Sequence, residues 1–442
     1  MPRSALALAL LLGLVGCSNP KSVSKGDAPS VTASAHPPAA SASAEPADAA
    51  VAVADAAPPE VLAGADFGAQ AKALFRIAAC AGDAPLPAGL DAAVALAHCK
   101  ELSTMYADYK KGWMAVAMPF LAKLVPAEAP KVVVYPFGGG DLLGALATYP
   151  DGVEYTTVSL EIAADVRKVD ALKNAALAPT LARYRMVLGK LFEKAHSRTD
   201  NLDIDSKSPL PGEIVFDLVA MAVHGYEPTN LRYFKIKDDG SLHYVEQAEI
   251  DAGDQAVKAG KKQRADVDDD LFAHVEVRFK KAGAAAGPTK ILRHIAFNLD
   301  DKHMKANPRL LKYLEAEAHP KIAAMTKAAS HLLWSDDFSI VRNYLATHTD
   351  SMISDSTGFT PAYAKKMGFV QDTYGTFTWP EPFGTVDVKN AEDLKKLFST
   401  NPHTEISFRY GYPDKDHHGH IVVTHKPGVV GSIAKDATRD GG

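Results

Sequence analysis

The sequence predicts an α/β fold, in which a Rossmann-like mixed sheet carries antiparallel additions and an N-terminal helical subdomain. Three observations point to this class. Residues 132–135 form a continuously apolar run that a helical segment and a second apolar run follow, which is typical of two parallel strands joined by a crossover. Asp238-Asp239-Gly240 separates two further apolar runs and is a strong hairpin signal. Residues 66–124 repeat apolar side chains at helical spacing.

The chain begins with an export signal, residues 1–16. The apolar stretch that follows Arg3 has about half of the roughly 20 residues that a membrane-spanning helix needs. Residues 14–17, Leu-Val-Gly-Cys, resemble the lipobox of bacterial lipoproteins, in which the cysteine becomes the acylated N-terminus. The resemblance implies a lipid anchor on Cys17, and Ser18 after it favours the outer membrane. The alternative is a cleaved secretory signal with a chance cysteine.

A low-complexity segment, residues 17–62, follows the signal. It consists almost entirely of Ala, Pro, Ser, Val and small polar residues. Such a segment cannot bury enough apolar surface to offset the entropy lost on ordering, so we expect a disordered Ala/Pro/Ser tether. The whole chain has a net charge of -5 with acids and bases interspersed, and therefore lacks the basic face that a nucleic-acid-binding protein needs. We expect a membrane partner through the lipid anchor and no nucleic-acid partner.

Residues 63–128 are expected to form the helical subdomain. Glycines and prolines between residues 82 and 89 separate its first two helices and place Cys80 and Cys99 on neighbouring helices. An exported chain enters a compartment that permits disulfides. We predict that the two cysteines pair and close a loop of about 20 residues, which contributes roughly 3 kcal/mol in the chain-entropy model. The alternative is two separately buried thiols.

Residues 129–426 are expected to form the α/β domain, and residues 427–442 a flexible tail. Apolar and β-branched runs predict strands at 132–135, 155–160, 231–237, 242–246, 273–279, 291–298, 405–410 and 420–424. Helical periodicity predicts helices at 141–149, 165–196, 213–224, 308–333 and 338–348. The first two strands are expected to pair in parallel, and the last two to form a C-terminal hairpin.

The turn after the first strand, Tyr135-Pro136-Phe137-Gly138-Gly139-Gly140-Asp141, resembles a motif of a family of uncharacterised, often exported bacterial proteins. The family pattern is roughly Y-P-F-x-G-x-D-F-L, followed by G-L-E, for which this chain has Ser159-Leu160-Glu161. Further matches in the same order are Arg198-Thr199, residues 330–340 (SHLLWSDDFSI), Asp355, Gly358 and Tyr374-Gly375. The resemblance covers most of residues 110–425 and implies no particular activity.

The same turn has the layout of a nucleotide-binding loop. Gly138, Gly140 and Gly144 follow a strand and open a helix, and Glu161 closes the next strand about 20 residues later, where Rossmann-like domains place an acid on the ribose hydroxyls. The layout is similar to the first motif of S-adenosylmethionine-dependent methyltransferases. Two observations oppose this use. Asp141 is expected to cap the helix and to occupy the positive end that a phosphate needs, and an exported protein lacks the usual cofactor pools.

Three uses of the turn therefore stay open: a structural turn, a site for another small polar ligand, or a nucleotide-type site. We expect no cofactor. The candidate ligand-binding residues are Tyr135, Gly138, Gly139, Gly140, Asp141, Glu161 and Arg198.

The C-terminal run of Asp and His residues at 414–420 invites a zinc interpretation, because imidazole and carboxylate are zinc ligands. The run lies on a predicted turn, so we expect a solvated loop and no metal site. The best-marked hydrolase, metalloprotease and P-loop motifs are absent from the sequence. Whether the protein is an enzyme stays open.

The sequence thus predicts a membrane-anchored lipoprotein that binds a small ligand or an envelope protein. One alternative is an enzyme with dispersed active-site residues, and another is a methyltransferase-like Rossmann domain, with or without its cofactor. A deep pocket would favour the enzyme if it joined Tyr135, Asp141, Glu161 and Arg198 with a later acid, Asp300 or Asp355.

Overall fold

The structure, a computed structural model, describes residues 62–194, 208–284, 287–317, 320–378, 388–401, 404–412 and 416–433. The predicted lipidation site Cys17, nearly all of the tether, Arg198 and the end of the C-terminal tail lie outside these residues.

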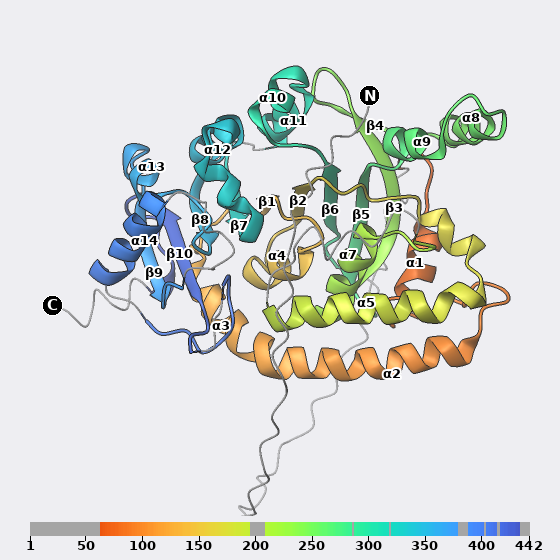
Figure 1. The fold of residues 1–442 in the computed structure, drawn as a ribbon, viewed down its shortest axis with the longest axis horizontal. Helices are drawn as coiled ribbons and strands as arrows, with labels where there is room; N and C mark the ends of the chain where they lie inside the picture. Colours follow the sequence, from red (N-terminus) through yellow and green to blue (C-terminus); the bar gives the residue numbers. More distant parts are fainter. Residues whose placement is uncertain are drawn as a thin grey trace, which may run out of the picture. The chain divides into compact units, whose positions relative to one another are not determined.

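The described strands form one mixed sheet in the order β4-β3-β5-β6-β2-β1-β7-β8-β10-β9 (Figure 1). The strands are β1 Val132–Pro136, β2 Glu154–Ser159, β3 Tyr226–Ile236, β4 Leu242–Tyr244, β5 His274–Lys281, β6 Lys290–Ala296, β7 Ile322–Thr326, β8 Thr349–Ser354, β9 Val370–Gly375 and β10 His420–His425. Strands β6, β2, β1, β7 and β8 run parallel in the centre. Antiparallel β5, β3 and β4 extend one side, and β10 lies antiparallel between β8 and β9 on the other. The predicted α/β class is confirmed.

Helices cover both faces of this sheet. They are α1 Gly68–Ile77, α2 Ala92–Tyr109, α3 Ala115–Leu124, α4 Leu142–Thr148, α5 Asn174–Lys194, α7 Glu213–Val223, α8 Gln247–Lys258, α9 Arg264–Leu271, α10 Asp301–Ala306, α11 Arg309–Glu317, α12 Ser339–His348, α13 Pro361–Lys366 and α14 Val388–Thr400. Shorter turns are the π-helix η1 Lys110–Met114 and the 3-10 helices η2 Val166–Ala171, η3 Ala328–Trp334 and η4 Asp336–Phe338. None of the described helices combines the length and apolar character needed to cross a bilayer.

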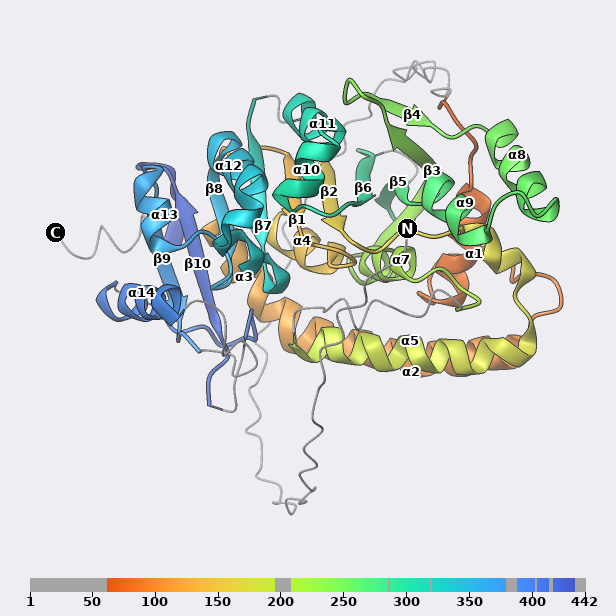
Figure 2. The same ribbon diagram turned by 45° about the horizontal axis from the view of Figure 1, so that its top comes forward.

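The pleat of β1 divides the core into two hydrophobic clusters, because successive side chains of a strand point to opposite faces. Val133 and Tyr135 pack into a cluster with helices α1 to α5 and α7, and Val134 packs into a second cluster with α10 to α12. Figures 1 and 2 show α2 and α5 side by side on the first face. The helices of residues 63–128 therefore share one core with the sheet.

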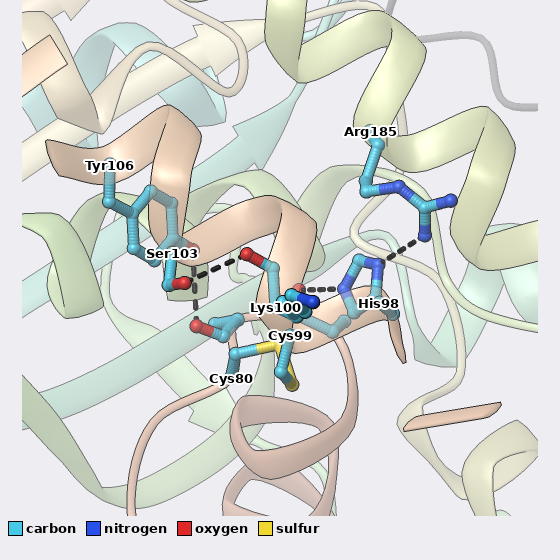
Figure 3. Close-up of a disulfide and its surroundings, with 9 residues drawn as sticks. Cys80, His98, Cys99, Lys100, Ser103, Tyr106 and Arg185 are labelled. Carbon is cyan, nitrogen blue, oxygen red and sulfur yellow. Dashed lines mark hydrogen bonds between the residues drawn. A yellow bond between two sulfur atoms is a disulfide. The ribbon is translucent and has the colours of Figure 1, made fainter. Parts of the chain in front are cut away.

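A disulfide bond joins Cys80 and Cys99, as predicted, with Cα atoms 5.3 Å apart (Figure 3). Cys99 lies in α2, but Cys80 lies in the loop after α1, where it has a left-handed φ of 56°. His98 beside the bond is buried. Its Nε2 contacts the carbonyl oxygen of Ala78 at 3.0 Å and its Nδ1 contacts Arg185 at 2.9 Å. The bond and these contacts fasten the end of α1 to α2 and α5.

The predicted helix at 308–333 is confirmed in its first half, which forms α11, and wrong in its second half, where the chain forms strand β7 and the 3-10 helix η3. The run IAAMT of β7 is buried on both faces of the sheet, so it lacks the alternation that marks a half-exposed strand. The expected C-terminal hairpin is also wrong. Residues 405–410 form no strand, and β10 pairs with β8 and β9, two strands that the sequence did not predict.

Candidate functional site

The strand order creates a crevice at the carboxyl ends of β1 and β7. The chain passes from β1 to β2 and β6 on one side and then returns to β7 on the other side of β1. In open α/β sheets, ligands bind at such a switch point, outside the carboxyl ends of the strands. A non-glycine residue with left-handed backbone follows each flanking strand: Phe137, directly after β1, has φ 61°, and Ala328, two residues after β7, has φ 52°. Such strained residues are rare and concentrate at functional sites.

The three glycines after β1 form a tight turn. The amide of Gly138 donates to the carbonyl of Tyr135 at 3.1 Å, and the amide of Asp141 donates to the carbonyl of Gly138 at 2.9 Å. A Cβ atom on Gly138 would stand 2.6 Å from Cγ of Tyr135, and Gly139 has φ 41°. Side chains at these positions would thus push the turn away from β1.

Tyr135, Asp141 and Lys327 form a buried polar cluster that holds the turn in place. Asp141 caps α4 by accepting a hydrogen bond from the amide of Gly144 at 2.9 Å, as the sequence predicts. Its Oδ2 accepts a hydrogen bond from the Tyr135 hydroxyl at 3.0 Å and lies 2.8 Å from Nζ of Lys327. Burial and the neighbouring Asp141 raise the pKa of Tyr135 well above its ordinary value, so the hydroxyl keeps its proton and donates.

A cavity of about 300 Å³ opens above the turn, between the carboxyl ends of β1, β2 and β6 and the segment after β7. This volume lies at the lower end of the range of small-molecule sites. The residues that line it are Phe137, Gly138, Gly139, Ser159, Leu160, Glu161, Phe297, Asn298, Leu299, Asp300, Ala329, Leu332 and Phe338. The rings of Phe137 and Phe338 meet edge to face, with centroids 5.7 Å apart.

The polar side of the cavity carries two acids from neighbouring strand ends. Oε1 of Glu161, just after β2, is buried, and none of the described residues forms a hydrogen bond with it. Asp300 caps α10 and accepts hydrogen bonds from the amide and ring of His303 at 2.8 and 2.7 Å. Burial alone would raise the pKa of Asp300. The hydrogen bonds from His303 outweigh burial and hold this pKa below its ordinary value. No lysine, arginine or histidine is among the described residues that line the cavity.

Two further carboxyl groups lie fully buried on α7. Glu213 and Asp217 are one helical turn apart, and among the described residues no group forms a hydrogen bond with any of their four oxygens. Burial and the neighbouring Asp217 raise the pKa of Glu213 well above its ordinary value, and burial and Asp141 do so for Asp217. Nδ1 of His294 lies 3.7 Å from Glu213, and its Nε2 contacts the backbone oxygen of Glu161 at 2.8 Å. His294 therefore connects the buried acids of α7 to the backbone of Glu161, which lines the cavity.

The structure thus separates the predicted site residues into two layers. Gly138, Gly139 and Glu161 line the cavity together with Asp300. Tyr135 and Asp141 do not line it and instead hold the glycine turn in place through their hydrogen bond. Gly140 is buried within the turn and does not line the cavity, and Arg198 lies outside the described residues.

Asp355 is fully buried away from the cavity, where it accepts a hydrogen bond from the amide of Ala328 at 3.0 Å.

Sequence reasoning missed Lys327, Glu213 and Asp217. Lys327 fell within a segment that the sequence assigned to a helix, and no motif marks it. The two acids carried a usable signal, because they stand one turn apart in the otherwise apolar helix EIVFDLVAMAV.

A second cavity, of about 470 Å³, lies between α2, η1, α5 and residues 407–409. Tyr109, Trp113 and Phe408 form its buried wall, and Asp108 and Arg409 are exposed at its rim. Of the candidate ligand-binding residues of the glycine turn that the structure describes, none lines it, whereas His418 of the C-terminal run does.

The C-terminal histidines do not converge in the structure. His420 is buried between the rings of Phe377 and Phe398, whereas His417 and His418 are exposed. Within the described ranges, no group of three or more His, Cys, Asp or Glu side chains is placed to hold a metal ion.

Comparison of the chain with protein families, with curated proteins and with solved structures found no match.

Proposed function

We propose that this protein binds a non-phosphorylated nucleoside-type ligand in the cavity at the switch point. The observation that carries the proposal is the buried Oε1 of Glu161, which lines the cavity at the end of β2 and accepts no hydrogen bond from any described residue. A buried carboxylate oxygen without a donor is costly, and a ligand hydroxyl would satisfy it. In Rossmann-like domains an acid after the second strand binds ribose hydroxyls in this way.

The apolar walls of the cavity fit the base of such a ligand. Phe137, Phe297 and Phe338 come from three different segments and border the same space. Aromatic side chains bind flat rings by stacking or edge contacts. A ring between these side chains and a diol on Glu161 would account for both the apolar and the acidic lining.

The charges of the cavity favour a neutral or cationic ligand over a phosphate. Glu161 and Asp300 are acids, and the described lining has no cationic side chain to balance a phosphate. The start of α4 is already occupied by the carboxylate of Asp141. Adenosine has this chemistry, and so does S-adenosylmethionine, which carries a sulfonium cation on an adenosine, although the export proposed below would separate the domain from the usual pool of that cofactor.

We also propose that the domain is exported and held at the outer membrane by a lipid on Cys17. The lipobox resemblance and the Ala/Pro/Ser tether support this location. The Cys80–Cys99 bond supports it further, because disulfides persist in oxidising compartments.

Calorimetric titration of the full chain with S-adenosylhomocysteine, S-adenosylmethionine, adenosine and ATP tests the ligand proposal. We expect the adenosine compounds without phosphate to bind and ATP not to bind. Glu161→Gln should weaken binding about 10- to 100-fold, because a hydrogen bond to a charged group contributes about 1.5–3 kcal/mol.

Glu128→Gln, at an exposed position that does not line the cavity, is the matched control and should bind as the wild type does. Equal affinity of the Glu161→Gln and Glu128→Gln variants would exclude Glu161 as the ligand contact, and the absence of heat with every adenosine compound would reject the nucleoside-type ligand.

A further inference from the structure

We propose that Lys327 is a positioning residue of the switch-point cavity, acting through its ion pair with Asp141. The inference rests on the proposed ligand site and deepens it. The pair joins the two strands that flank the crevice, because Asp141 ends the turn after β1 and Lys327 directly follows β7.

The ion pair is deeply buried. Nζ of Lys327 and Oδ2 of Asp141 are 2.8 Å apart, and the two side chains are 2% and 4% exposed. The ammonium also lies 5.3 Å from the ring centroid of Tyr410. Separating two buried opposite charges is costly, because each charge alone would be buried without compensation. The ion pair therefore fixes the positions of both side chains.

Each partner of the pair is directly connected to a wall of the cavity. The amide of Asp141 donates to the carbonyl of Gly138, which lines the cavity, at 2.9 Å. Lys327 precedes Ala328, whose strained backbone leads to Ala329 on the opposite wall. A shift of either partner would therefore move one wall of the cavity relative to the other.

Helix capping alone does not explain the pair. An asparagine would cap α4 as well as Asp141 does, since Asn and Asp are equally good at the N-cap position. The charge at position 141 adds the link across the crevice to Lys327. Asp141→Asn therefore keeps the cap and removes the ion pair, which separates the two roles.

The test compares Asp141→Asn, Lys327→Met and the double variant, each as the full chain. Urea unfolding measures stability, and titration with S-adenosylhomocysteine, well below the unfolding transition, measures the dissociation constant. Each single variant leaves one buried charge without its partner and should lose stability. The double variant removes both charges and should regain most of that stability. If the pair positions the cavity walls, the double variant should still bind at least 10-fold more weakly than the wild type.

Lys365→Met, at an exposed position on α13, is the matched control and should leave both quantities unchanged. A double variant that regains wild-type affinity together with stability would overturn the positioning role and leave the pair a purely structural one. Failure of the wild type itself to bind would refute the proposed function instead, so the two failures are distinguishable.

Discussion

The buried acids of α7 make the folding stability of this protein depend on pH. Glu213 lies fully buried near Asp217, and its carboxyl oxygens accept no hydrogen bond from the described residues. Two carboxylates this close cannot both ionise in a dry interior, so we expect Glu213 to stay protonated in the folded state at pH 7. Replacement by glutamine keeps the shape of the protonated acid and removes its titration.

The magnitude follows from the ordinary pKa of a glutamate, 4.5. Above pH 4.5 the unfolded chain ionises this group while the folded chain keeps the proton, which costs about 1.36 kcal/mol per pH unit. The wild type therefore loses unfolding free energy at up to this slope as the pH rises above 4.5, and Glu213→Gln does not. The unfolding free energy falls with rising pH because the pKa of Glu213 is higher in the folded state than in the unfolded chain. The contribution is complete below pH 4.5 and is lost as the pH rises towards the pKa of the folded state.

Urea unfolding followed by tryptophan fluorescence at pH 4.5, 6, 7 and 8 measures this difference. We expect the variant and the wild type to be similar at pH 4.5 and the variant to be more stable at pH 7, with a difference that grows by up to about 1.4 kcal/mol per pH unit. Glu128→Gln, at an exposed position, should follow the wild type at every pH. If the stability curves of wild type and Glu213→Gln stay parallel across this range, burial does not hold the proton and the reasoning is refuted.

Three further predictions concern the bond, the turn and the anchor. Replacing Cys80 and Cys99 by serine should lower the unfolding free energy by about 3 kcal/mol, and the intact chain should take up alkylating reagent only after reduction, as mass spectrometry would show. Gly138→Ala should destabilise the domain and weaken ligand binding, because its methyl group would stand 2.6 Å from the ring of Tyr135. Gly112→Ala is the control, because its methyl group meets open space, and it should be neutral or stabilising in the same denaturation assay. Cys17→Ser should release the protein from the membrane fraction on cell fractionation if the cysteine carries the lipid anchor.

The local motifs of the sequence predicted the first half of the sheet well. The run before the glycine turn, the parallel strand after it and the hairpin around Asp239 all follow from short-range chemistry: β-branched runs, glycine and a capping acid. Spacing along the chain also placed Glu161 at the cavity, because it ends the strand next to β1. The role of a residue can be predicted from the sequence in this way when that role depends on residues close to it in the chain.

The parts that depend on distant neighbours were not predictable. The alanine-rich run of β7 has a local preference for helix, and its burial between β1 and β8 overrides that preference. The error removed Lys327 from consideration, because its role depends on Asp141, the N-cap of α4, which is far away in the sequence. The pairing of β10 with β8 and β9 was missed for the same reason.

The position of β7 late in the chain also affects how the protein folds. The hydrogen bond from the Tyr149 hydroxyl to the carbonyl of Ala324 joins residues 175 positions apart. Until β7 is in place, one edge of β1 stays open, and the acid at position 141 lacks its lysine. Pairing at such sequence distance is slow, and open apolar strand edges invite association between chains. A chain that ends before residue 322 should therefore aggregate instead of forming a smaller domain, so the first half of the sheet depends on completion of the second.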